Sequence, residues 1–239
     1  MRIRPGLERG TLVRRYKRFL ADISLPDGST LTVHCPNTGA MLGCAEPGSE
    51  AWYSDSHNPS RKYRHTLEVV VGATGRVGVN TARANRLVEE ALAERTLSPL
   101  AGCSLVRAEA PIPDESGRFD FLLEDERGAP CYVEVKNMTL CDASGRGSFP
   151  DAVSDRAIKH VRALARRVAA GERGVLIFCA QHTGVRFATL ADEIHPEYGE
   201  AVRTAEAEGV EVYAFGCRVE PGEIRIESAL PVELADQRR

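Results

Sequence analysis

The sequence contains no long apolar run. No stretch of its 239 residues approaches the roughly 18 apolar residues that a membrane-spanning helix needs. The first ten residues, MRIRPGLERG, also lack the apolar segment of a secretory signal peptide. With 43% hydrophobic and 27% charged residues, the composition is that of an ordinary globular protein. We therefore expect a cytoplasmic protein with no membrane partner.

The cysteines form no recognisable framework. There are seven, an odd number, and none belongs to a CxxC pair. This pattern argues against a disulfide scaffold and against a zinc ribbon. We expect most of these thiols to be reduced, buried and inert.

The hydrophobic pattern changes near residue 80. Before it, short apolar runs are separated by turn signals such as Pro26–Gly28 and Gly72–Gly75, with no helical period. About five strands in roughly 70 residues predict an OB-like β-barrel domain over residues 1–80. Residues 81–239 follow the order α-β-β-β-α-β-α-β-β, which predicts an α/β (α+β) domain. Its helices are expected at about 82–94, 151–170 and 196–208.

Charge is distributed unevenly between these two predicted domains. Residues 1–80 hold 11 Lys and Arg against 7 Asp and Glu, a net of +4. The remaining residues hold 20 against 27, a net of −7. A basic module joined to an acidic one fits binding of a polyanion by the first module, although a difference of this size also arises by chance.

A predicted hairpin carries the strongest candidates for chemistry. The runs RFDFLLED and CYVEVKN flank a polar turn. If the turn centres on Arg127, Asp120 lies opposite Glu134, and Glu134 shares one face with Lys136. Facing carboxylates repel each other, and a bound Mg²⁺ or Mn²⁺ would remove the penalty. With Lys136 beside the metal, such a site can activate water for attack on phosphorus. The alternative is a salt-bridge ladder of Asp120 with Lys136 and of Arg118 with Glu134 on a solvated face.

The spacing of these residues resembles the PD-(D/E)xK nuclease signature. Asp120 is followed after 13 residues by Glu134-Val135-Lys136, although Phe119 stands where the signature has proline. The α-β-β-β-α-β order is also that superfamily's core order. The resemblance implies catalytic roles for Asp120, Glu134 and Lys136 and a third acidic metal ligand on the first helix, for which Glu90 is the candidate. For Glu90 an exposed ion pair with the arginine one turn earlier is the alternative.

Basic residues are the candidates for nucleic-acid binding. On the long helix, Arg156, Lys159 and His160 recur at helical spacing opposite a predicted buried stripe of Val153, Ala157, Val161, Leu164 and Val168. In the barrel the candidates are Arg15, Lys17 and Arg18 around Tyr16, and Arg61, Lys62 and Arg64 around Tyr63. Cations neutralise phosphates and aromatic rings stack on unpaired bases. We expect Phe19 and Leu20 to be buried instead. Solvated basic faces are the alternative for both regions.

Segments along nearly the whole chain resemble the sugar fermentation stimulation protein A family. They are Arg18–Asp22, His34–Met41, Gly78–Thr81, Ala84–Arg86 and Phe149–Val153, within a match from about Arg9 to Leu234. The resemblance implies an N-terminal OB-like domain and a C-terminal PD-(D/E)xK-like domain. It also implies DNA binding and a link to the regulation of sugar metabolism, notably of maltose.

Three functions are therefore open. The first is a DNA-binding protein with a live, Mg²⁺- or Mn²⁺-dependent phosphodiesterase site. The second is a binding-only regulator with a silent nuclease fold, and the third is a barrel that binds an oligosaccharide. The sequence shows no helix-turn-helix or zinc finger, so we expect DNA to be bound with low sequence specificity. The oligomeric state is open, a homo-oligomer included.

Overall fold

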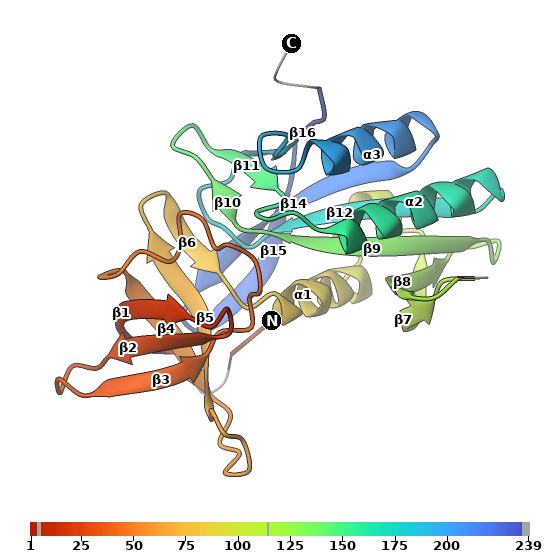
Figure 1. Cartoon of the computed structure of the whole chain (residues 1–239). Helices are drawn as coiled ribbons and strands as arrows, with labels where there is room; N and C mark the ends of the chain where they lie inside the picture. Colours follow the sequence, from red (N-terminus) through yellow and green to blue (C-terminus); the bar gives the residue numbers. More distant parts are fainter. Residues whose placement is uncertain (4–5, 114, 236–239) are drawn as a thin grey trace.

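Short strands at the N-terminal end of the chain form a β-barrel (Figure 1). The computed structural model describes residues 1–3, 6–113 and 115–235. The strands run in the order β3-β2-β1-β4-β5-β6, and a parallel pairing of β3 with β5 closes the barrel. Their bounds are β1 Glu8–Tyr16, β2 Leu20–Ser24, β3 Thr30–His34, β4 Glu50–Asp55, β5 His65–Gly72 and β6 Gly75–Gly78. The predicted OB-like barrel is confirmed.

Turn residues and alternating side chains account for the barrel. Gly28 has a φ of +84° in the turn after β2, and Gly75, the first residue of β6, has a φ of +144° directly after the preceding turn. Glycine enters this region of φ without the penalty that a Cβ would bring. Between the turns, the inward-facing Ile23, Val33 and Leu67 have no exposed surface. The turn signals in the sequence therefore mark real reversals of the chain.

The second module is a six-stranded mixed sheet with helices on both faces (Figure 1). Its strands run in the order β15-β14-β12-β9-β8-β7, with β9, β12 and β14 parallel and the outer pairings antiparallel. Helix α1 (Ala82–Ala93) packs on one face, and α2 (Asp155–Ala169) and α3 (Pro196–Ala207) pack on the other. The strands are β7 Ser104–Pro111, β8 Arg118–Glu124, β9 Pro130–Met138, β12 Arg173–Ala180, β14 Glu211–Glu220 and β15 Glu223–Leu230. The predicted α-β-β-β-α-β core is confirmed.

The structure adds small elements that the sequence pattern does not reveal. A second sheet of order β10-β11-β13-β16 consists of β10 Leu140–Cys141, β11 Arg146–Phe149, β13 Phe187–Leu190 and β16 Val232–Glu233. A 3-10 turn, Ser98–Leu100, follows α1. Strands of two to four residues are too short to show an alternation, which explains why they were not predicted.

Helix α2 begins four residues later than predicted. The side chain of Ser154 caps it by accepting a hydrogen bond from the Ala157 N–H at 3.3 Å, so Asp155 is the first helical residue. Val153 therefore precedes the helix and is 68% exposed, and its predicted place in the buried stripe is wrong. Val161 and Leu164 are fully buried as expected.

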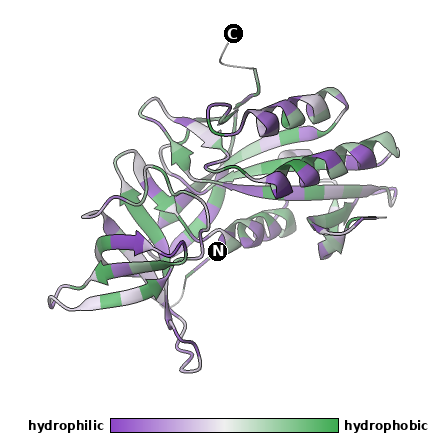
Figure 2. Ribbon diagram, in the orientation of Figure 1, coloured by the Kyte–Doolittle hydropathy of each residue, from purple (hydrophilic) through white to green (hydrophobic). Residues whose placement is uncertain are grey.

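The central strands orient the candidate site. Figure 2 shows β12 and β14 as largely hydrophobic ribbons, whereas α2 alternates between hydrophilic and hydrophobic residues. On β12, Ile177 points into the core beside α1, and Leu176 points into the core beside α2 and α3. Leu176 is paired with Glu134 of β9, so Glu134 and Lys136 project toward the α2 side of the sheet.

The N-terminal residues pack on the second module. The Ile3 N–H donates to the Gly222 carbonyl at 2.9 Å, and the Ile224 N–H donates to the Met1 carbonyl at 3.0 Å. Ile3 and Leu7 belong to the core cluster that contains α1. The chain thus starts against β15 before it enters the barrel.

All seven cysteines are buried and free, as the sequence predicts. Burial raises the pKa of the Cys44 and Cys131 thiols to about 12, so both are protonated at neutral pH. No helix in the described part of the chain is long and apolar enough to cross a membrane.

Candidate functional site

The predicted carboxylates lie where β8 and β9 begin to separate. The two strands pair in the predicted register, and the last pair is Phe121 with Val133. One residue further, Asp120 uses its Oδ2 to accept the Val135 N–H at 2.7 Å. Asp120 and Glu134 are thus neighbours at the end of the hairpin ladder, close enough for the charge of Glu134 to act on Asp120.

Asp120 is a carboxylate whose charge is poorly compensated. Its Oδ1 accepts a hydrogen bond from Nδ2 of Asn85 on α1 at 2.7 Å. Burial and the negative charge of Glu134 nevertheless raise the pKa of Asp120 to about 6. A nearby cation would favour the charged form of this group.

Glu134 is 3% exposed and is held by two basic side chains. Its Oε1 accepts hydrogen bonds from Lys136 Nζ and His160 Nδ1, each at 2.5 Å. Burial by itself raises the pKa of Glu134, but the His160 hydrogen bond and the Lys136 charge outweigh burial and hold this pKa below its usual value. Its Oε2 is buried and has no hydrogen-bond partner among the described residues.

These donors fit a small, hard cation. Asp120 offers carboxylate oxygen, and Oε2 of Glu134 is a buried acceptor without a partner. Mg²⁺ is commonly held by one or two carboxylates while it keeps several waters. Within the described residues there is no group of three or more His, Cys, Asp or Glu side chains that could hold a metal. A cation here would therefore take the rest of its ligands from water and other oxygens.

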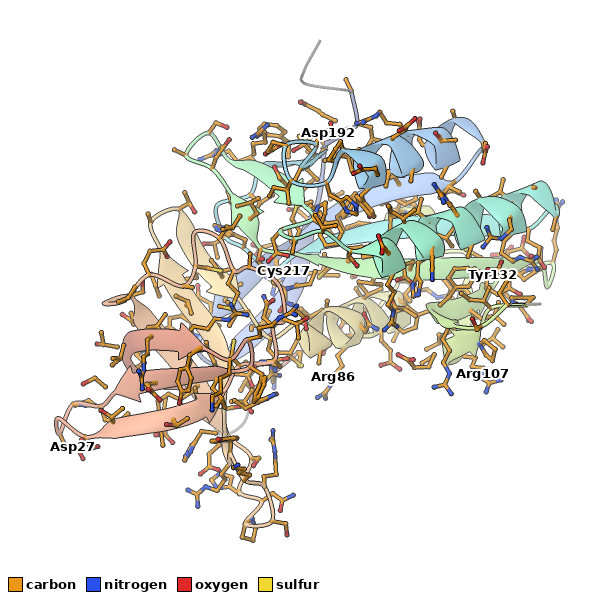
Figure 3. The ribbon with its side chains drawn as sticks, viewed as in Figure 1. Asp27, Arg86, Arg107, Tyr132, Asp192 and Cys217 are labelled. Carbon is orange, nitrogen blue, oxygen red and sulfur yellow. The ribbon has the colours of Figure 1, made fainter. Side chains whose placement is uncertain are left out.

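Glu90 does not belong to this site. Its carboxylate forms an ion pair with the amino group of Met1 and is 40% exposed. Glu90 lies five residues after Asn85 on α1, which turns it about 140° away around the helix axis. The prediction of Glu90 as third metal ligand is wrong, and its partner is Met1 rather than Arg86, whose side chain extends away from the ribbon in Figure 3.

The alternative salt-bridge ladder is not formed either. Lys136 pairs with Glu134 of its own strand instead of reaching diagonally to Asp120. The second partner of Glu134 is His160 of α2, where the ladder would have placed Arg118. His160 is buried, so it belongs to the carboxylate site and not to a solvated basic face of α2.

A cleft of about 450 Å³ opens beside the carboxylates, between the barrel and the α/β module. Asn85 and Lys136, which bind the two carboxylates, both line it. The barrel contributes Arg18 and the loop 37–39, and the α/β module contributes the loop 149–154 and Arg156. Segments that are distant in the sequence therefore meet over one site.

The two loops across the cleft are tied to each other. The Met41 N–H donates to Asp151 Oδ2 at 3.1 Å. Gly39 lies so close that a Cβ on it would come within 2.3 Å of the same carboxylate oxygen. Thr81, at the start of α1, donates from Oγ1 to the Pro36 carbonyl at 3.0 Å instead of capping its own helix.

The basic residues of the β1–β2 turn have different roles. The Arg15 guanidinium donates to the backbone carbonyls of Arg18, Asn37 and Gly39 at 2.8 to 2.9 Å. Arg15 therefore holds the loop through its Nη2, and its role as a nucleic-acid-binding residue stays a prediction. Lys17 and Arg18 are exposed. Phe19 is 47% exposed, so its predicted burial is wrong, whereas Leu20 is buried as expected.

The other predicted binding residues lie on exposed surface. Arg61 and Lys62 are exposed in the loop between β4 and β5, and Arg156 and Lys159 are exposed on α2. Arg64 is exposed too, but its guanidinium forms an ion pair with Asp55 at 2.6 Å. The basic candidates are thus spread over three regions, of which only the Arg18 and Arg156 regions line the cleft.

Two family models match the chain. They describe an SfsA N-terminal OB domain over residues 13–79 and a sugar fermentation stimulation protein RE domain over residues 82–223. The chain belongs to the sugar fermentation stimulation protein family. A family homolog from Hahella chejuensis is 51% identical over 225 residues, 93% of each chain. Another from Teredinibacter turnerae is 49% identical over 237 residues, 98% of this chain and all of the relative.

A solved structure of the family has the same fold. It is that of Pyrococcus furiosus SfsA in complex with Ca²⁺, with a TM-score of 0.88, 24% identity and 98% coverage of each chain. In this chain, residues from the segments that resemble the family lie together at the cleft. Asn85 and Asp151 lie in those segments, and this was the available signal for two residues to which the sequence analysis gave no role.

Proposed function

We propose that this protein binds DNA with little sequence preference and hydrolyses its phosphodiester bonds with the help of Mg²⁺ or Mn²⁺. The observation that carries the proposal is the buried Oε2 of Glu134, which has no partner in the described residues and lies next to the under-compensated carboxylate of Asp120. Buried polar atoms are rarely left unpaired, so we expect a water or a cation at this oxygen. The presence of Ca²⁺ in the Pyrococcus furiosus structure supports a divalent cation.

Each residue of the site would have its own role in this reaction. When bound, the cation would polarise a phosphoryl oxygen and lower the pKa of a water. Asp120 and Glu134 would hold it, and Asn85 and His160 would keep these two carboxylates oriented. Lys136, which lines the cleft, would stabilise negative charge that develops on the phosphate.

Binding would rest mainly on phosphate contacts. Lys17, Arg61, Lys62 and Lys159 are exposed cations outside the cleft, and the module that carries three of them has a net charge of +4. Neutralising phosphates releases counterions and needs no particular base sequence. Through such binding the protein would take part in the regulation of sugar metabolism, as the name of its family suggests, and the resemblance to the family implies that this includes maltose.

A binding-only regulator is the second candidate. Lys136 and His160 already bind one oxygen of Glu134, so the cluster is partly satisfied without a metal. In that case the nuclease-like module would be a scaffold for DNA binding and would have no catalytic role.

Melting and cleavage measured together separate the two candidates. Purified protein is heated with EDTA, with Mg²⁺ and with Mn²⁺, and is incubated with labelled DNA under the same conditions. We expect Mn²⁺ to raise the melting temperature, since a ligand that binds only the native state stabilises it by RT ln(1 + [L]/Kd), and to permit cleavage. Asp120→Asn should abolish both effects, and Glu90→Gln should leave both intact. DNA binding without a metal-dependent melt or cleavage would favour the binding-only regulator.

A further inference from the structure

We propose that the cleft admits single-stranded DNA and excludes the intact duplex, and that Phe19 stacks on a base of the bound strand at its mouth. This inference rests on the proposed function, because it names the substrate of the same site. It follows from the size of the cleft, the way its walls are joined, and the side chains around it.

Glu134 is recessed below the cleft, and Asp120 beside it is half-buried. Glu134 is 3% exposed, and Lys136 and Asn85 lie between the carboxylates and the cleft. The cleft volume of about 450 Å³ is in the range that encloses a drug-sized molecule, roughly 300–1,000 Å³. A site of that size encloses a short piece of one strand and not two paired strands. A phosphate of a paired strand would have to leave the duplex to reach this site.

The walls of the cleft are joined by polar contacts. Met41 binds Asp151 from across the cleft, and Thr81 binds the Pro36 carbonyl at its base. The barrel is also fixed to the sheet by the Gly78 N–H, which donates to the Gln181 carbonyl at 2.6 Å. Widening the cleft to the diameter of a duplex would break these contacts together.

One exposed apolar side chain lines the cleft, and a second belongs to the residue that follows a lining residue. Val153 is 68% exposed and lines it, and Phe19 is 47% exposed and follows Arg18, which also lines it. Singly exposed apolar side chains are common on protein surfaces, and what distinguishes these two is their place, in the cleft lining or directly after a lining residue. Unpaired bases present flat apolar faces, and stacking on an aromatic ring is sequence-tolerant because every base has such a face.

The charges of the cleft match a single strand. Arg18, Lys136 and Arg156 place three cations along its lining, which suits consecutive phosphates of one backbone. The carboxylate of Asp151 also lines the cleft, where its Oδ2 accepts the Met41 N–H, and the three cations outnumber it. Cations for the backbone and an aromatic ring for a base are the two elements that sequence-tolerant single-strand binders combine.

The test uses the full chain and three forms of one DNA sequence. A labelled strand of about 20 nucleotides, longer than the site of one OB fold, is offered alone, annealed to its complement, and as a duplex with an unpaired tail. Binding is measured in EDTA and cleavage in Mn²⁺. We expect the single strand to be bound and cut at least tenfold better than the blunt duplex, with cuts in the tailed duplex confined to the tail.

Variants of Phe19 test the stacking contact. We expect Phe19→Ala to weaken single-strand binding by roughly tenfold, as loss of one base–aromatic contact should, and Phe19→Tyr to retain it. Leu105→Ala, at an exposed apolar residue on β7, should behave as wild type. Blunt duplex cut as readily as single strand, or a Phe19→Ala variant that binds normally, would overturn this inference and leave the proposed nuclease in place. Protein that neither binds nor cuts any of the three DNA forms would overturn both.

Discussion

Asn85 and Asp120 are joined by a hydrogen bond of 2.7 Å that runs from α1 to the start of β8. The first helix thus supplies an amide at the point where an acidic metal ligand was expected. An amide donor stabilises the charged form of Asp120 without adding a third negative charge beside Glu134. The site therefore has two carboxylates in a setting that disfavours the ionisation of one of them.

Asp120→Asn should stabilise the metal-free protein at neutral pH. The pKa of Asp120 is about 6 in the folded chain, above roughly 3.9 in an unfolded one. Its contribution to stability is therefore complete below about pH 4 and is lost as the pH rises through 6. Asparagine does not ionise, so the variant keeps the stability that wild type loses as Asp120 becomes charged. Its side-chain NH2 group can still donate to Asn85, because the Asn85 amide can turn its oxygen toward it.

We expect the variant to gain on the order of 1–2 kcal/mol at about pH 7.5 and close to nothing at about pH 4. Calorimetry in EDTA at the two pH values measures both quantities. A variant that melts below wild type at the higher pH would show that the ionised Asp120 is already well compensated by its neighbours.

Replacing Arg61 and Lys62 by alanine should weaken DNA binding without unfolding the protein. Both side chains are exposed, and such substitutions usually change stability by under about 0.5 kcal/mol. Loss of two phosphate contacts should lower the slope of log affinity against log salt by roughly two. Fluorescence anisotropy over a series of salt concentrations measures that slope.

The matched control removes two cations from the far end of the sheet. Arg107 lies on edge strand β7, well away from the barrel in Figure 3, and Arg127 lies in the β8–β9 turn. Arg107→Ala with Arg127→Ala should keep the wild-type slope. Equal losses in both double variants would mean that net charge, and not the loop between β4 and β5, governs binding.

Glu68→Ala should be strongly destabilising. Glu68 on β5 is 2% exposed and accepts hydrogen bonds from Arg83 Nε and Nη2 at 2.5 and 2.6 Å, and from Ser54 and Asn80. Removing one partner of a buried pair leaves the other charge uncompensated, at a cost of about 3–5 kcal/mol. The denaturation midpoint in urea measures the loss.

The ion pair of Glu115 with Arg166 provides the comparison. Its side chains are 33% and 49% exposed, so Glu115→Ala should cost under about 1 kcal/mol. A loss of stability from Glu68→Ala as small as that from Glu115→Ala would mean that water reaches Arg83 in the variant and replaces the lost carboxylate.

The hairpin of the site could be predicted because its contacts are local. A single turn around Arg127 sets the register of β8 and β9, and the period of two then puts Glu134 and Lys136 on one face. The contact of Asn85 with Asp120 could not be predicted in this way. It depends on how α1 is rotated against the sheet, which the packing of Leu87 and Val88 in the shared core decides.

The wrong predictions for His160 and Phe19 have physical reasons of the same kind. His160 is polar and was assigned to the basic face, yet it occupies the buried face of α2 with Ala157 and Leu164 because Glu134 is there to receive it. Phe19 is apolar and was assigned to the core, yet the turn between β1 and β2 leaves it outside the barrel. The contact of His160 with Glu134 and the position of Phe19 outside the barrel both depend on the tertiary structure. The spacing of hydrophobic residues in the sequence does not predict either of them.

Gly39→Ala should separate the two walls of the cleft. A Cβ at this position would meet the two carboxylate oxygens of Asp151 at 2.3 and 2.5 Å, so the loop or Asp151 has to move. Overpacking of this kind costs about 1–3 kcal/mol. We expect a lower melting temperature and slower cleavage of single-stranded DNA. Gly102→Ala is the control, because among the described residues no atom beyond its two chain neighbours lies within 4 Å of the added Cβ.

A double variant shows whether Asp151 is the obstacle. Asp151→Ala removes the atoms that the new methyl group would meet, although it also gives up the hydrogen bond to the Met41 N–H. Residues in contact are not additive, so the double variant should be more stable than the sum of the two single losses predicts, by about 0.5 kcal/mol or more. If the losses in the free energy of unfolding are strictly additive, the strain of Gly39→Ala lies inside its own loop, for instance at the Gly39 carbonyl that Arg15 binds. The contact of this loop with Asp151 across the cleft would then contribute little to the stability of the fold.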